Sequence, residues 1–139
     1  MVYLESVRYS RRVAWRNVVA GQRVPMELTS LGRAWLSAAD DNTFNHLMEC
    51  FRTRRTAGWR ALSRDIGAAV DNVRKEGFCW ASWQPEVVAL AAPLAVAGHP
   101  VYVLNMSVTS DVAPAETVAR LREPLLALAN QLNDSIRHL

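Results

Sequence analysis

Residues 24–38 constrain the fold most, because they predict an extended segment that turns directly into a helix. Pro25 has no backbone N–H and biases the residue before it toward the extended region, so a preceding strand should end there. Thr29 or Ser30 can cap the first helical turn with a side-chain oxygen. Gly32 is a poor helix former, and its expected value is to let another backbone or a ligand come close.

The apolar residues of this stretch recur with helical spacing, at Leu28, Leu31, Trp35, Leu36 and Ala39. A helix N-terminus carries free N–H groups and a partial positive charge, so one opened by Thr and Ser can hold an anion. Two interpretations stay open at this point: a plain corner between strand and helix, or an anion-binding corner.

The chain of 139 residues has the length and composition of one soluble domain, and we expect residues 1–139 to form it. No apolar run approaches the ~18 residues of a membrane span, and no charged-then-apolar leader opens the sequence, so we expect a cytoplasmic protein without membrane association. A net charge of +3 is too mild for a dedicated nucleic-acid binder. The arginines at 52, 54, 55, 60 and 64 are expected to form a solvated helix end.

Strands and helices are predicted in groups rather than in strict alternation. Strands are expected at residues 1–7, 13–19, 78–83, 87–92 and 101–109. Helices are expected at residues 28–39, from 40–42 to about 51, at 59–75 and at 115–138. Pro124 should form a kink or a joint in the last of these helices. Grouped strands favour an α+β fold with a mainly antiparallel sheet and flanking helices.

The last predicted strand changes character halfway along one face. Val103 is followed on that face by Asn105 and Ser107, whereas the opposite face is apolar apart from the hydroxyl of Tyr102. Polar groups on a face that starts buried need partners, and a small ligand would be one. A strand that runs from the core out to solvent would need none, so both interpretations stay open.

Enzyme chemistry finds little support. His46, Glu49 and Cys50 would share a helix face, but the set is incomplete for zinc. No Ser or Cys stands in a nucleophile motif, and no Gly-rich phosphate loop is present. Cys50 and Cys79 form no C-x-x-C pair and are expected to be small buried hydrophobes. We therefore expect no enzyme, no cofactor and no metal.

Four segments resemble, in order and at similar spacing, the effector-binding domain of IclR-family transcriptional regulators. Residues 25–38 resemble the family's P-L-H-A-T-A-x-G-K-A-L-L-A signature, residues 75–78 its R-x-R-G-Y, residues 87–93 its A-I-A-A-P-V strand and residues 104–108 its L-S-V-S-G strand. With the opening residues 2–5, the likeness covers essentially the whole chain. It implies a GAF-like fold, N-terminally truncated relative to the family.

The resemblance also implies a site for a small organic acid between the signature helix and the facing strands. Carried over by position, its residues are Ser30, Leu31, Ala81 or Ser82, Val87, Ala89, Asn105 and Ser107. The sequence departs from the family at Glu27, where His is usual, at Asn105 in the S-x-S pair, and after Gly77, where an acidic residue is absent. Trp80 and Trp83 imply a bulkier site and a flatter, more apolar effector, such as an aromatic acid. Arg33 is expected to point toward solvent or a partner subunit.

Family members carry a DNA-binding domain before the point where this sequence starts, so we expect this polypeptide to bind no DNA by itself. The resemblance implies an effector-binding and oligomerisation domain that forms a homodimer or homotetramer, and the exposed edge expected at residues 2–7 would favour pairing. The alternative is a structural dimerisation module whose pocket is filled by Trp80 and Trp83.

Overall fold

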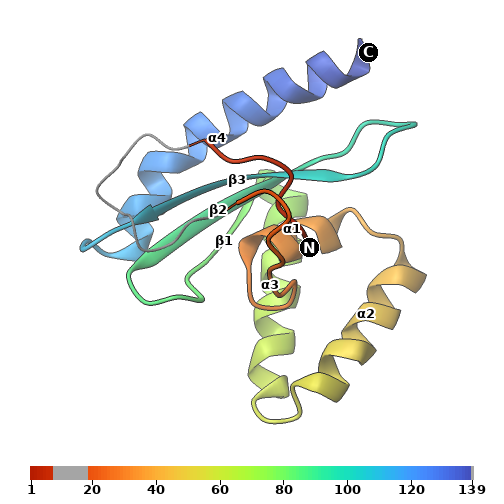
Figure 1. Ribbon diagram of the computed structural model, residues 1–139. Helices are drawn as coiled ribbons and strands as arrows, with labels where there is room; N and C mark the ends of the chain where they lie inside the picture. The colour runs from red at the N-terminus through yellow and green to blue at the C-terminus, as the bar shows by residue number, and fades with distance from the viewer. Residues whose placement is uncertain (8–18, 139) are drawn as a thin grey trace.

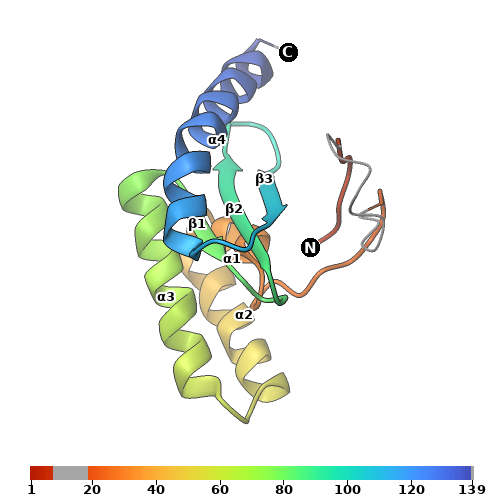
Figure 2. The same cartoon turned by 90° about the vertical axis from the view of Figure 1, so that its left-hand side faces the viewer.

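The computed structural model describes residues 1–7 and 19–138. Its antiparallel sheet has the strand order β1-β2-β3, with β1 at Cys79–Ala81, β2 at Val87–Leu94 and β3 at Tyr102–Thr109. The helices are α1 (Ser30–Ser37), α2 (Asp41–Arg54), α3 (Trp59–Glu76) and α4 (Pro114–Arg137). Figures 1 and 2 show α4 along one face of the sheet, α1 and the C-terminal half of α3 against the other, and the connected ends of α2 and α3 extending away. The predicted α+β fold is confirmed.

Alternation along the strands divides the core between the two faces. On the α4 side, Val88, Leu90, Ala92 and Leu94 pack with Leu125 and Ala129. On the other side, Ala91 and Cys79 pack with Ala34 of α1 and with Ala69 and Val73 of α3. A third cluster joins α1, α2 and α3 through Leu36, Phe51, Ile66 and Val70. The two faces expected of the last strand are confirmed, because Leu104 and Met106 pack on the α4 side and Val103 on the other.

The segment that leads into α1, residues 24–29, is called the approach segment below. Thr29 is the N-cap of α1: its Oγ1 accepts the N–H of Gly32 at 3.2 Å, and its hydroxyl donates to the carbonyl of Pro25 at 2.8 Å. A Cβ placed on Gly32 would lie 2.2 Å from the Cα of Met26. The capped helix start and the close backbone approach at Gly32 are both as predicted.

The expected strand at residues 1–7 is wrong. The structure has only an isolated bridge between Val2 and Arg23, supported by hydrogen bonds from Tyr3 to Gln22 and from Gly21 to Tyr3. A short segment that pairs only with the chain next to the approach segment gains too few ladder bonds to form a longer strand. The strand expected at 13–19 lies outside the described residues, apart from Val19.

Most of the remaining elements lie where they are predicted, with ends shifted by one to three residues: α1 is two residues shorter at each end, and α2 continues to Arg54. β1 ends at Ala81, two residues early, because the chain turns through Pro85 and through Glu86, whose φ is 63°. β2 continues through Pro93, which lies beyond the first residue of β1, Cys79, so that β2 has only β3 as a neighbour there. A proline is tolerated at such an edge position.

The predicted C-terminal helix is present as α4, which continues past Pro124 to Arg137. Among residues 1–7 and 19–138, none of the helices combines the length and the apolar character needed to cross a membrane.

Candidate ligand-binding site

The N-terminus of α1 meets the sheet at Ser30, which is 1% exposed. The amide nitrogen of Asn105 on β3 lies 2.8 Å from the carbonyl oxygen of Leu90 and 3.5 Å from the hydroxyl of Ser30. The thiol of Cys79 on β1 donates to the carbonyl of Ser30 at 3.4 Å. Groups from a helix and from two outer strands are thereby brought to one point.

The strand register places small residues in rows across the sheet face that carries α1, called the α1 face below. One row is Cys79–Ala91–Asn105, and the next is Ala81–Ala89–Ser107. Ala81 and Ala89 are buried, Asn105 is half-buried and Ser107 is exposed. Five of the residues carried over by resemblance therefore lie in these two rows or abut them: Ser30, Ala81, Ala89, Asn105 and Ser107.

The other carried-over residues are placed differently. Val87 is half-buried in the row beyond Ala89, and Leu31 is buried in α1. Ser82 lies past the end of β1, and its hydroxyl donates to the carbonyl of Val87 at 2.7 Å. Of the two alternatives at this point, Ala81 is the residue on the α1 face, and Ser82 closes the turn between β1 and β2.

Trp80 lies on the opposite side of the sheet, and the expectation that it makes the site bulkier is wrong. It is paired in register with Leu90, whose side chain belongs to the core under α4. Successive residues of a strand point to opposite faces, so Trp80 points away from Cys79 and Ala81. Trp80 and Trp83 are 41% and 40% exposed.

First-turn N–H groups of α1 remain available next to the α1 face. Thr29 takes the N–H of Gly32, and the N–H groups of Ser30 and Leu31 have no acceptor within the described residues. Such groups attract anions, and the helix dipole adds to the attraction. The arrangement can accept hydrogen-bonding oxygen atoms from a small ligand.

The thiol of Cys79 is unsuited to chemistry. Burial raises its pKa to about 12, and the nearby charge of Arg33 only partly opposes this rise. The thiolate is the reactive form of cysteine, so the buried thiol is inert near neutral pH.

We expect an aromatic disulfide reagent at pH 8 to label Cys50 quickly in the folded protein and Cys79 only after unfolding in urea. Cys50 is half-buried, whereas Cys79 is 1% exposed. Absorbance of the released thiolate would report one thiol before unfolding and two after it. Rapid native labelling of two thiols would contradict this placement of Cys79.

Arg33 does not extend freely into solvent, which was one of the two placements expected for it; the other, toward a partner subunit, stays a prediction. Its Nε donates to the carbonyl of Glu27 at 3.1 Å, and the side chain is half-buried. Burial lowers the pKa of the guanidinium, against the charge of Asp65, which raises it. Arg33 therefore holds the approach segment against α1.

Glu27 makes a contact that the sequence reasoning missed. It is 6% exposed, and its Oε1 lies 3.0 Å from Nε of Arg55, which follows α2. The two residues are 28 positions apart, so no local pattern pairs them. The only local signal is an acid flanked by Met26 and Leu28, since a buried acid requires a partner. This ion pair ties the approach segment to the end of α2.

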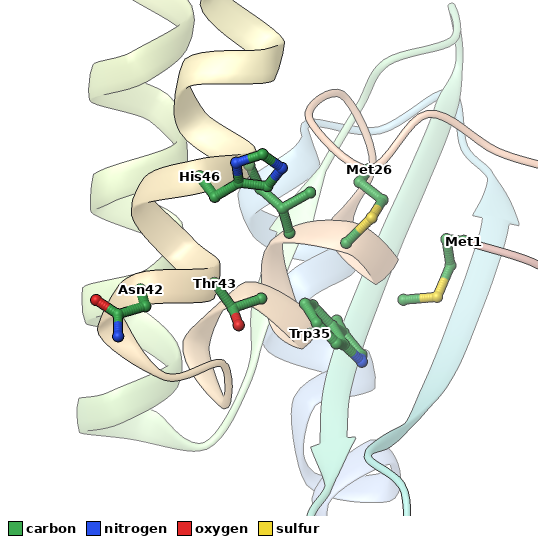
Figure 3. A pocket seen from close by; sticks show the side chains of 7 residues that line it. Met1, Met26, Trp35, Asn42, Thr43 and His46 are labelled. Atoms are coloured by element: carbon green, nitrogen blue, oxygen red, sulfur yellow. The ribbon is translucent and has the colours of Figure 1, made fainter.

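Two adjoining hollows of about 640 and 610 Å³ lie between the approach segment, α1 and α2, away from the α1 face. Figure 3 shows the first, with Asn42, Thr43 and His46 of α2 on one side and Met1, Met26 and Trp35 on the other. The sequence reasoning did not anticipate it, because its walls come from separate parts of the chain.

The three residues of α2 judged too few for a zinc site, His46, Glu49 and Cys50, gain no further His, Cys, Asp or Glu ligand within the described residues. Nε2 of His46 lies 3.7 Å from Sγ of Cys50, while Glu49 accepts a hydrogen bond from Arg52. Within the described residues, no group of three His, Cys, Asp or Glu side chains is arranged to hold a metal ion.

Comparison with known proteins identifies a matching family model and solved structures of similar fold. A family model described as "Bacterial transcriptional regulator IclR C-terminal" matches residues 1–134. An IclR family transcriptional regulator from Brucella abortus superposes with a TM-score of 0.82 at 25% identity, covering 97% of this chain and 51% of that one. A transcriptional regulator from Rhodococcus sp. RHA1 gives 0.78 at 23% identity, covering 97% and 56%. The chain thus spans about half the length of these two regulators.

A third similar structure holds a ligand. The inducer-binding domain of a double mutant of the transcription factor PobR from Acinetobacter, in complex with 3-hydroxybenzoic acid, gives a TM-score of 0.63 at 21% identity. The superposition covers 89% of this chain and 74% of that one.

Proposed function

We propose that this chain, which belongs to the IclR C-terminal family of bacterial transcriptional regulators, senses a small organic or aromatic acid. The carrying observation is the meeting of the Asn105 amide, the Ser30 hydroxyl and the first N–H groups of α1 beside small residues on the α1 face. The 3-hydroxybenzoic acid bound by the similar PobR domain supports the choice of ligand class.

The proposed acid is bound without a cationic side chain. Its carboxylate accepts hydrogen bonds from the N–H groups of Ser30 and Leu31, with the α1 dipole adding to the attraction. Asn105 and Ser107 supply further donors. The contact from Asn105 to Ser30 is long, at 3.5 Å, so exchanging it for a charged acceptor costs little and gains a stronger bond. Val87 and Ala89 line the floor for the body of the acid.

A thermal-shift panel of small organic and aromatic acids, including 3-hydroxybenzoate, tests this function. A ligand that binds only the folded state, at 100 times its dissociation constant, should stabilise the chain by about 2.7 kcal/mol. That corresponds to an upward shift of roughly 10 °C for a domain of this size. A flat response across the whole panel would instead favour a purely structural dimerisation module.

The assembly and the whole regulator's action belong to the same proposal. Within the described sheet, β1 and β3 each have one edge without a strand partner, and open edges favour association. A homodimer or homotetramer is proposed, with DNA bound in the cytoplasm through a separate domain of the complete regulator.

We expect light scattering at roughly tens of micromolar to give two or four times the chain mass of 15.5 kDa. A clean monomer mass at that concentration would contradict the proposed oligomer. Ligand sensing would still be tested separately, by the thermal-shift panel of acids.

A further inference from the structure

The two hollows beside α2 form one groove along a single helix face. Asn42, His46, Cys50 and Arg54 recur at four-residue intervals, and all four line one hollow or the other. Four residues line both hollows: Met1, Met26, His46 and Leu47. From Asn42 to Arg54 the helix rises roughly 18 Å at ~1.5 Å per residue, so the groove is long enough for an extended small molecule.

The groove changes chemistry from one end to the other. Near the start of α2 its walls are mainly the apolar surfaces of Met26, Trp35 and Leu47. Near the end of α2 it is lined by Arg54 and Arg55.

The two arginines differ in what they can offer a ligand. Arg55 is paired with Glu27, which neutralises it. Arg54 is exposed and has no carboxylate partner in the part of the chain that the structure describes. The groove thus combines an apolar end with one unpaired guanidinium at the other.

We propose that this groove is a second ligand site, for a carboxylate with an aromatic or alkyl body. The body lies against Met26, Trp35 and Leu47, and the carboxylate pairs with Arg54. Each hollow has a volume of the size that small-molecule sites use, ~300–1,000 Å³. Guanidinium and carboxylate are complementary in both charge and geometry. None of the residues proposed to contact the ligand belongs to the α1 face.

Isothermal titration with 2-naphthoate and its uncharged analogue 2-naphthalenemethanol tests the proposal. Arg54→Gln should weaken 2-naphthoate binding about tenfold, since the charge-assisted bond is partly exposed to solvent, and should leave the alcohol within about twofold. Arg120→Gln is the matched control, because Arg120 is exposed on α4 and does not line the groove. The substitution removes the same positive charge as Arg54→Gln. It should change 2-naphthoate binding by less than about twofold.

A blocking variant tests the apolar end. Asn42 is exposed and lines the first hollow, so Asn42→Trp should reduce binding of both probes without unfolding the chain, which a thermal melt checks. Equal losses from Arg54→Gln and Arg120→Gln would overturn the proposal, as would a lack of 2-naphthoate binding to the unaltered chain.

Asn105→Leu separates this site from the proposed acid site on the α1 face. It should leave 2-naphthoate binding unchanged if the groove is the site. Loss of binding with Asn105→Leu but not with Arg54→Gln would place the probe on the α1 face, which overturns the groove and supports the sensing proposal.

Discussion

Replacing Gly32 with alanine should destabilise the chain by about 3 kcal/mol or more, because the added methyl group overlaps a neighbouring backbone. It would lie 2.2 Å from both the Cα and the carbonyl oxygen of Met26. No side-chain rotation relieves such an overlap, so α1 must move away from the approach segment. At about 4 °C per kcal/mol for a domain of this size, the unfolding midpoint should fall by about 12 °C.

Gly67→Ala is the matched control for this prediction. Gly67 lies inside α3, and a Cβ there would meet nothing within 4 Å. Alanine should therefore stabilise α3 by about 0.5–1 kcal/mol through its better helix propensity. Urea unfolding of both variants measures the difference. A Gly32→Ala variant as stable as the Gly67→Ala variant would show that α1 and the approach segment do not pack this closely.

Local patterns in the sequence were sufficient to predict those features of the fold that depend only on residues close together in the chain. The capped start of α1 follows from Thr29, and the close approach at Gly32 follows from a glycine in a first helical turn. The two faces of β3 follow from its alternation around Asn105. Each depends on residues within a few positions of one another, which a pattern can register.

Features that depend on distant parts of the chain were missed or mistaken. The pairing of Glu27 with Arg55 joins residues 28 positions apart. The hydrogen bond from Arg33 to the backbone carbonyl of Glu27 could not be predicted either, because a backbone acceptor is not identified by any residue type in the sequence. The groove beside α2 has walls from the approach segment, α1 and α2.

The positions of the candidate residues were anticipated only in part. The resemblance placed Ser30, Ala89 and Asn105 near one another, and strand register brings them to the α1 face. It also placed Trp80 in the pocket, whereas the alternation of β1 turns that side chain toward the α4 side. A shift of one residue along a strand moves every side chain to the opposite face, and in the three-residue strand β1 this decides which of Cys79, Trp80 and Ala81 faces α1.

Loss of a single donor on the α1 face should have a large effect on acid binding. An uncharged group that donates to a charged ligand typically contributes about 1.5–3 kcal/mol, so Asn105→Leu or Ser107→Ala should weaken the acid roughly ten- to a hundredfold. Arg33→Ala should have a small effect, because that guanidinium is bonded to the carbonyl of Glu27. Arg54→Gln should have a small effect as well, since Arg54 lines the separate groove.

The most direct measurement is therefore isothermal titration of the most stabilising acid of the panel into the unaltered chain and these four variants. The account predicts a large loss of affinity for Asn105→Leu and Ser107→Ala, and a change within about threefold for Arg33→Ala and Arg54→Gln, as expected for groups outside the site. A large loss from Arg33→Ala or Arg54→Gln, with Asn105→Leu and Ser107→Ala binding as the unaltered chain does, would contradict acid sensing at the α1 face.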